Sequence, residues 1–143
     1  DCSEVVEAVV AAMLTHAASV DVQLHACGAL AAFARTSEEA AHVAELGGVE
    51  AVQKAMRRHP DSADVQWSAC EALQRLSRDP LVGAGDCSEV VLAVLAAMEK
   101  HAAKAVLQRA ACGLLRNIGQ VEEPRRRVVE LSGIGAVLQA MRA

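Results

Sequence analysis

The chain has 143 residues, of which 53% are hydrophobic and only 1% aromatic, and its formal net charge at pH 7 is −4. The mildly acidic balance argues against general nucleic-acid binding, which requires a basic surface. The longest apolar run, Val90 to Met98, is too short to cross a bilayer and no signal peptide is visible, so we expect neither membrane insertion nor secretion.

Apolar residues that recur at three- and four-residue steps predict helices throughout the first half of the chain. Asp1 and Ser3 are candidate N-caps for the first helix. Gly47 and Gly48 end the third helix, because glycine past the last turn is the usual stop signal. The predicted helices of this half span residues 3–16, 20–34, 37–46, 49–59 and 63–77.

The second half begins with a break in the helical pattern. Residues 79–85 contain too much proline and glycine for a helix, so they are predicted as a loop. Pro124 fits the first turn of a short helix, where its missing N–H costs nothing. The predicted helices of this half span residues 87–101, 104–119, 122–131 and 134–142.

One sequence unit recurs along the whole chain with a period in the low forties. Four methionines are spaced by 43, 42 and 43 residues, and histidines, cysteines and leucines recur with the same step. The equivalent positions are Met13, Met56, Met98 and Met141; His16, His59 and His101; Cys27, Cys70 and Cys112; Leu30, Leu73 and Leu115. A fixed period of this length without strand signals predicts an all-α solenoid.

A longer period of 85 residues is superimposed on the short one. The sequence of residues 1–6 reappears at residues 86–91, and Leu46-Gly47-Gly48-Val49 reappears as Leu131-Ser132-Gly133-Ile134. Two slightly different units therefore alternate, as expected from duplication of a two-unit block.

These units resemble armadillo repeats. Residues 47–52 are similar to the Gly-Gly entry into the second helix of that family, and residues 65–76 and 106–118 are similar to its third helix. The resemblance covers essentially the whole chain and implies a right-handed superhelix. We expect a single domain over 1–143, with units at 1–36, 37–78, 79–119 and, incomplete, 120–143.

The resemblance also implies a partner-binding groove lined by the third helices. In the family, an Asn on that helix binds the backbone of an extended peptide, and here only Asn117 matches, because Ala32 and Arg75 hold the other equivalent positions. The Trp that often stands one turn earlier is absent, so the chain departs from the pattern of nuclear import receptors. The candidate groove residues are Leu24, Trp67, Glu71, Arg75, Arg109 and Asn117.

Two of these assignments have alternatives. Trp67 is the only tryptophan, and tryptophan is enriched at binding hot spots, but it could also pack against a neighbouring helix. Glu71 and Arg75 are four residues apart, so they could simply pair with each other on one helix.

The recurring cysteines and histidines favour structural roles. Equivalent positions in stacked helices lie about 10 Å apart, whereas a disulfide needs Cα atoms within about 7 Å and zinc needs ligands at about 2 Å. We therefore expect buried free thiols, and histidines that meet free backbone carbonyls at helix ends. The odd count of five cysteines favours a reducing compartment, the cytoplasm or the nucleus.

The expected function is a protein-interaction scaffold that binds a protein or peptide partner along its concave face. No catalytic, metal or cofactor site and no small-molecule substrate are predicted, since no phosphate loop or catalytic spacing occurs. The alternative is a spacer or self-assembly segment of a larger protein, because solenoid ends need capping. Weak homo-oligomerisation is predicted through apolar ends at Val6, Val10 and Leu14 and at Ile134, Val137 and Leu138.

Overall fold

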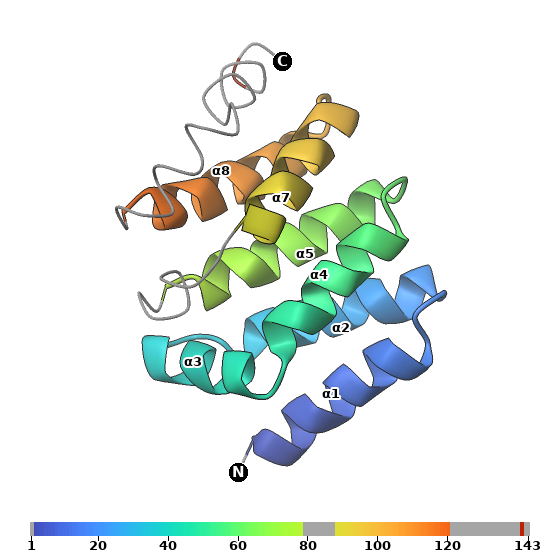
Figure 1. Cartoon of the computed structure of the whole chain (residues 1–143), viewed down its shortest axis with the longest axis vertical. Coiled ribbons are helices and arrows are strands. Elements are labelled where there is room, and N and C mark those ends of the chain that lie inside the picture. Colours follow the sequence, from blue (N-terminus) through green and yellow to red (C-terminus); the bar gives the residue numbers. More distant parts are fainter. Residues whose placement is uncertain (1, 79–87, 121–140, 142–143) are drawn as a thin grey trace.

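The computed structural model describes residues 2–78, 88–120 and 141, and this part of the chain is helical without strands (Figure 1). Its helices are α1 (Ser3–Thr15), α2 (Val20–Ala32), α3 (Ser37–Glu45), α4 (Gly48–Arg58), α5 (Ala63–Leu76), α7 (Ser88–Lys100) and α8 (Ala105–Gly119). Each begins and ends within two residues of the range predicted from the sequence. The predicted loop at 79–85 and the predicted helices at 122–131 and 134–142 lie outside the described residues.

Side-chain caps fix the starts of several helices. Ser19 and Ser62 are the N-caps of α2 and α5. Their hydroxyls accept hydrogen bonds from the backbone N–H groups of Val22 and Val65, respectively. Thr36 and Glu39 form a reciprocal capping box at the start of α3, in which each side chain accepts from the backbone of the other residue.

The start of α1 differs from the prediction. Ser3 is the first helical residue and not the cap, a position that Cys2 holds without a side-chain cap bond. The Ser3 hydroxyl lies 2.6 Å from Nε2 of His42, so it links α1 to α3. Asp1, the other predicted cap, lies outside the described residues.

The turn between α3 and α4 requires both of its glycines. Gly47 has a backbone φ of +90°, in the left-handed region that other residues adopt only with strain. A Cβ atom on Gly48 would lie 2.6 Å from a Val43 methyl carbon and 2.9 Å from the Val43 carbonyl oxygen. The Gly-Gly pair therefore allows α4 to pack directly onto the end of α3.

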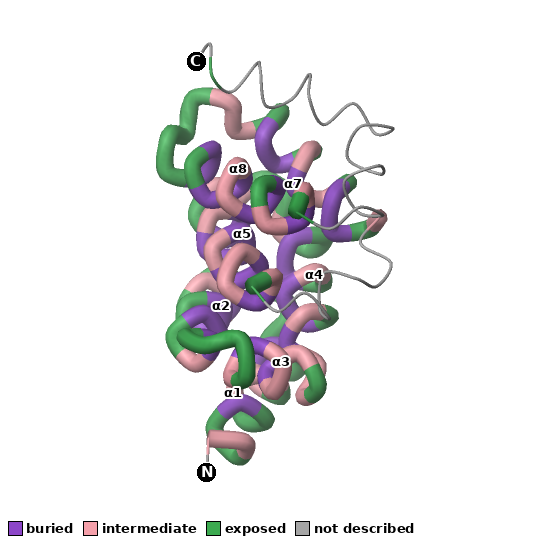
Figure 2. The backbone as a smooth tube through the Cα atoms, turned by 90° about the vertical axis from the view of Figure 1, so that its left-hand side faces the viewer, coloured by how far each residue is buried: buried purple, intermediate pink, exposed green. Residues whose placement is uncertain are grey.

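The helices form two layers, and Figure 1 shows them stacked along the long axis of the molecule. We call α1, α4 and α7 the outer layer and α2, α5 and α8 the inner layer. Figure 2 shows buried stretches in helices of both layers and exposed turns at their ends. Neighbouring inner helices make much more extensive contact than neighbouring outer helices. The stack is therefore tighter on its inner side, as expected for a solenoid that is concave along the inner layer.

Aliphatic side chains of moderate size form one continuous core. Leu30, Leu73 and Leu115 are 0%, 3% and 7% exposed, which confirms the prediction that these equivalent leucines are buried. The fold is thus an all-α solenoid, as predicted. The right-handed sense of the superhelix and the boundaries of the units stay predictions.

A buried glutamine recurs in the inner layer and was not predicted. The Nε2 atom of Gln66 donates to the carbonyl oxygens of Met56 and His59, both at 2.9 Å, where α4 ends. Gln23 makes the same bonds to Met13 and His16, and Gln108 to Met98 and His101. Met56 lies in the last turn of α4, where carbonyls have no intrahelical partner, so Gln66 supplies a donor to its carbonyl oxygen. The His59 carbonyl oxygen also accepts the backbone N–H of Ser62. Each glutamine thus joins an outer helix to the following inner helix.

The apolar end of the stack also differs from the prediction. Val6 is completely buried within the fold, and Leu14, although 54% exposed, lies on the opposite side of α1 from the exposed Val5. The predicted exposed face at Val6, Val10 and Leu14 is therefore wrong at Val6, which is buried, whereas Leu14 is exposed and Val10 is half-buried. The other predicted end, near Ile134, lies outside the described residues. None of the described helices is long and apolar enough to span a membrane.

Candidate partner-binding face

The candidate groove residues all lie in the inner layer. We call the solvent side of α2, α5 and α8 the inner face. Arg109 is exposed there, and the other candidates are half-buried: Leu24, Trp67, Glu71, Arg75 and Asn117. The structure thus places these residues on three adjacent helices, and their contacts show which atoms remain available to a ligand.

Trp67 is partly packed and partly exposed. The ring is partly buried and packs against the hydrophobic core, yet it is not enclosed. The adjacent Ser68 donates its hydroxyl to the Leu24 carbonyl oxygen at 2.9 Å, which holds this part of α5 against α2. Part of the indole surface therefore belongs to the packing between helices, and the remainder faces solvent on the inner face.

Arg75 is held by two neighbours. Its Nη2 lies 3.3 Å from Oε1 of Glu71, one turn earlier on α5, so the pairing considered from the sequence is present. Its Nη1 donates to the Ala31 carbonyl oxygen at the end of α2, at 3.4 Å. Both side chains of the ion pair are more than a third exposed. Arg75 therefore bridges two inner helices while its guanidinium remains open to solvent.

Asn117 uses its amide donors within the protein. Its Nδ2 donates to the Gln74 carbonyl oxygen at 2.9 Å and to the Ser77 hydroxyl at 3.1 Å. These bonds join α8 to the end of α5. An asparagine amide has two N–H donors, so only the Oδ1 oxygen, which has no partner among the described residues, can accept a hydrogen bond from a ligand.

The inner layer is basic although the chain is acidic. Residues 20–35, 63–78 and 104–119, which contain the inner helices and their exits, carry six basic and three acidic side chains. The basic residues are Arg35, Arg75, Arg78, Lys104, Arg109 and Arg116; the acidic ones are Asp21, Asp64 and Glu71. Asp64 pairs with Lys104 at 3.5 Å and Glu71 pairs with Arg75, so two of the three acids are already matched. The inner face therefore has positive charge available for a ligand.

The recurring histidines connect successive turns of the stack. Nε2 of His59 lies 2.7 Å from the Ala17 carbonyl oxygen, and Nε2 of His101 lies 2.9 Å from the Pro60 carbonyl oxygen. A carbonyl oxygen only accepts hydrogen bonds, so Nε2 carries the proton in both rings. His59 and His101 meet backbone carbonyls as predicted, but those carbonyls follow the preceding outer helix, and His16 makes no such contact among the described residues. The described residues hold no group of three or more side chains that could bind a metal ion.

The described cysteines are all free thiols. Burial raises the pKa of the Cys27 and Cys70 thiols to about 12, and the pKa of the half-buried Cys112 is raised for the same reason. A raised pKa keeps the thiol protonated and therefore unreactive at neutral pH. Cys27 and Cys70 behave as small core residues, as predicted, whereas Cys112 is only partly enclosed. Cys87 lies outside the described residues.

A serine, a histidine and a carboxylate come together beside α1, an arrangement that the sequence did not predict. Ser3 and His42 are in hydrogen-bond contact, but Nδ1 of His42 lies 4.0 Å from Oε2 of Glu45. That separation is too long for the hydrogen bond that orients a catalytic histidine. The contact therefore fastens α1 to α3 and does not form a triad.

Comparison with known proteins gives one result on the family. A family model described as LRRK2 ARM repeat matches residues 2–132 of the chain. No curated protein and no solved structure matches it.

Proposed function

The chain belongs to the armadillo-repeat family represented by the LRRK2 ARM repeat, and on that premise we propose that it is an interaction scaffold for an extended, acidic segment of a partner protein. The fold of this family is a repeat scaffold that commonly serves protein interaction. The proposed ligand lies along the inner face, across α2, α5 and α8. The proposed setting is the cytoplasm, with the nucleus as the alternative.

The single observation that supports this ligand is the charge of the inner layer. Arg109 has no ion-pair partner among the described residues, and Arg75 is open to solvent beside its matched acid. Arginine recognises carboxylates through two parallel hydrogen bonds, so exposed guanidinium groups favour aspartate- or glutamate-containing segments. An acidic ligand complements the positive charge of the inner face, although the net charge of the whole chain is −4.

The proposed binding mechanism combines an apolar anchor with polar contacts. Trp67 offers the open part of its indole as a surface for an aliphatic side chain of the ligand. The free Oδ1 of Asn117 can accept one N–H from the ligand backbone. In the family, the side-chain amide of this asparagine binds the peptide backbone. Here the Nδ2 donors of Asn117 already bond within the protein, so only its oxygen is left for the peptide. The arginines then select for negative charge.

The test uses fluorescence anisotropy with a labelled synthetic peptide of twelve residues that alternates glutamate and leucine. Changing Trp67 to Ala should weaken binding by about 2 kcal/mol or more, the scale of a hot-spot residue. Arg109→Glu should weaken it at least about tenfold, which corresponds to about 1.4 kcal/mol. Added salt should weaken binding by the wild type, because exposed charges are screened.

A matched control separates a specific site from general attraction. Arg58→Glu makes the same charge change on α4, in the outer layer, and should alter affinity by less than about twofold. Equal losses for Arg58→Glu and Arg109→Glu would contradict a site on the inner face. No binding by the wild type at millimolar peptide would contradict an acidic ligand. Circular dichroism of each variant checks that the fold is intact.

A further inference from the structure

Two arginines lie side by side where the central inner helix ends. Arg75 belongs to the last turn of α5, and Arg78 follows shortly after the end of that helix. The backbone N–H of Arg78 donates to the Arg75 carbonyl oxygen at 3.3 Å, so a tight turn links the two residues. Residues three apart in such a turn are neighbours on the surface. The other inner helices lack this combination, because the equivalent residues are Ala32 and Arg35 at the end of α2, and Asn117 and Gln120 at the end of α8.

Both guanidinium groups are held against the end of α2. Nη1 of Arg75 donates to the Ala31 carbonyl oxygen at 3.4 Å, and Nη1 of Arg78 donates to the Arg35 carbonyl oxygen at 3.0 Å. We call Arg35, Arg75 and Arg78 the arginine cluster. An arginine has five N–H donors, so the bonds that position Arg75 and Arg78 leave most of their donors free. The fold thus holds these donors in place before a ligand arrives, which reduces the entropy lost on binding.

The arginine cluster carries more positive charge than its neighbours neutralise. Of its three cations, only Arg75 has a carboxylate partner, which is Glu71. The other two are exposed and have no ion-pair partner among the residues that the structure describes. Glu38 and Glu39 lie in the first turn of α3, where Glu39 accepts from backbone N–H groups, and neither of them pairs with the cluster. Two positive charges of the cluster are therefore unmatched within the described part of the chain.

A phosphate ester fits this excess of charge better than a carboxylate does. At neutral pH a phosphate ester carries a charge of about −1.5 to −2 and three acceptor oxygens, whereas a carboxylate has a single charge and two oxygens that one guanidinium group satisfies. We propose that the arginine cluster binds the phosphate of a phosphoserine or phosphothreonine in the partner segment. This rests on the function proposed above, because the segment that carries the phosphate is the one that occupies the inner face.

The position of Trp67 sets the spacing within that segment. Trp67 and Arg75 both lie on α5, and their separation in sequence corresponds to about 12 Å along the helix axis. An extended chain rises about 3.3 Å per residue, so the side chain that contacts Trp67 and the phosphorylated residue are about three or four residues apart. The apolar anchor and the phosphate therefore belong to one short linear motif.

Fluorescence anisotropy with three versions of the alternating glutamate–leucine peptide tests the proposal. One central glutamate, placed at this spacing from a leucine, is kept, replaced by serine or replaced by phosphoserine. The phosphoserine peptide should bind at least about tenfold more tightly than the serine peptide and at least about threefold more tightly than the glutamate peptide. Arg78→Gln should reduce the tenfold ratio to less than about threefold. Arg35→Gln should act in the same direction, and its side chain makes no hydrogen bond within the described residues, so loss of packing does not explain the effect.

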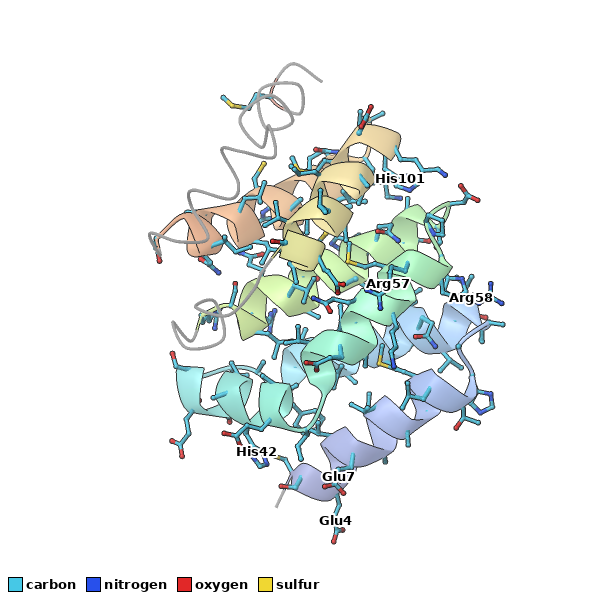
Figure 3. The ribbon with its side chains drawn as sticks, in the orientation of Figure 1. Glu4, Glu7, His42, Arg57, Arg58 and His101 are labelled. Atoms are coloured by element: carbon cyan, nitrogen blue, oxygen red, sulfur yellow. The ribbon has the colours of Figure 1, made fainter. Side chains whose placement is uncertain are left out.

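Arg58→Gln is the matched control and should keep the full preference for phosphoserine. It removes the same charge from an exposed arginine, and Figure 3 shows Arg58 at the end of α4, on the opposite edge of the stack from the end of α5. If the wild type bound the phosphoserine peptide no better than either other peptide, the phosphate site would be overturned. A preference that survives Arg78→Gln and Arg35→Gln, or that is lost in Arg58→Gln, would overturn it too. These results leave the loss expected for Trp67→Ala unchanged, so they are distinguishable from failure of the proposed function; no binding of any peptide would overturn both.

Discussion

The side-chain amide of Gln66 on α5 lies 2.9 Å from the carbonyl oxygen of Met56 in the last turn of α4. Gln66 is only 3% exposed, so this bond forms away from water. The same bond joins α1 to α2 and α7 to α8. The angle and register between outer and inner helices are therefore fixed three times by a polar contact inside an otherwise aliphatic core.

We expect Gln66→Leu to destabilise the fold by about 2–3 kcal/mol. Leucine is similar in size, so the main loss is that the buried Met56 carbonyl oxygen loses its donor, while the part-buried His59 carbonyl oxygen loses one of its two donors. Chemical denaturation followed by circular dichroism measures this difference. Gln53→Leu on α4 is the control, because Gln53 is half-buried without a side-chain hydrogen bond among the described contacts, and its cost should stay below about 0.5 kcal/mol. Equal costs would show that the bonds to Met56 and His59 contribute nothing specific.

The buried leucine of the central repeat should be among the most sensitive core positions. Leu73→Ala should lower the free energy of unfolding by about 2–5 kcal/mol, since Leu73 is 3% exposed and its removal leaves a cavity. Leu92→Ala on α7 makes the same chemical change at a residue that is 52% exposed. It should cost less than about 1 kcal/mol. A denaturant series in which Leu73→Ala costs less than Leu92→Ala would contradict the core described above.

Stability should fall at alkaline pH because of the two buried thiols. Burial raises the pKa of Cys27 and Cys70 from the ordinary value of 9.0 to about 12. The unfolded chain therefore loses these protons first, and the stabilisation present below pH 9 is lost as pH rises toward 12. Each thiol should steepen the decline by at most about 1.4 kcal/mol per pH unit. Denaturation of the wild type and of a Cys27→Ala, Cys70→Ala variant across this range should show a shallower decline in the variant; parallel curves would refute the assignment.

Metal chelation and thiol reduction should leave the fold intact. The described cysteines are free, and His59 and His101 donate to backbone carbonyls, so neither group acts as a metal ligand in the fold. Thermal melts with and without EDTA, and with and without a reductant, should agree within about 2 °C, which for a domain of this size is less than about 1 kcal/mol. A larger fall with either reagent would mean that a bound metal or a disulfide contributes to stability.

Periodic patterns predicted the fold well because they report the packing of each helix directly. The leucines at the position of Leu73 recur with the repeat and are buried, and the helix bounds follow from apolar spacing and from glycines such as Gly47. The glutamines at the position of Gln66 also recur at 43 and 42 residues, so the signal for their bonds was present in the sequence. It was not recognised, because a polar residue on a helix is usually assigned to the solvent side.

The inner face was harder to predict. Spacing alone placed Asn117 and Arg75 on one side of their helices, which the structure agrees with. It does not show whether a polar side chain on that side points to a ligand or to the neighbouring helix, and both residues donate to carbonyls of the preceding inner helix. The same limitation applies to the end of α1, where the free side depends on how α4 lies against it.

The close stacking of the inner helices has a consequence for how the molecule unfolds. The central helix α5 lies between α2 and α8, and it also contacts α3, α4 and α7, whereas α1 is held mainly by α2 and α4. Because each helix depends on its neighbours only, loss of structure can begin at the α1 end and stop before it reaches the centre. Backbone amides of α5 should then exchange with deuterium more slowly than those of α1, and opening would proceed as a graded sequence of steps rather than as a single event.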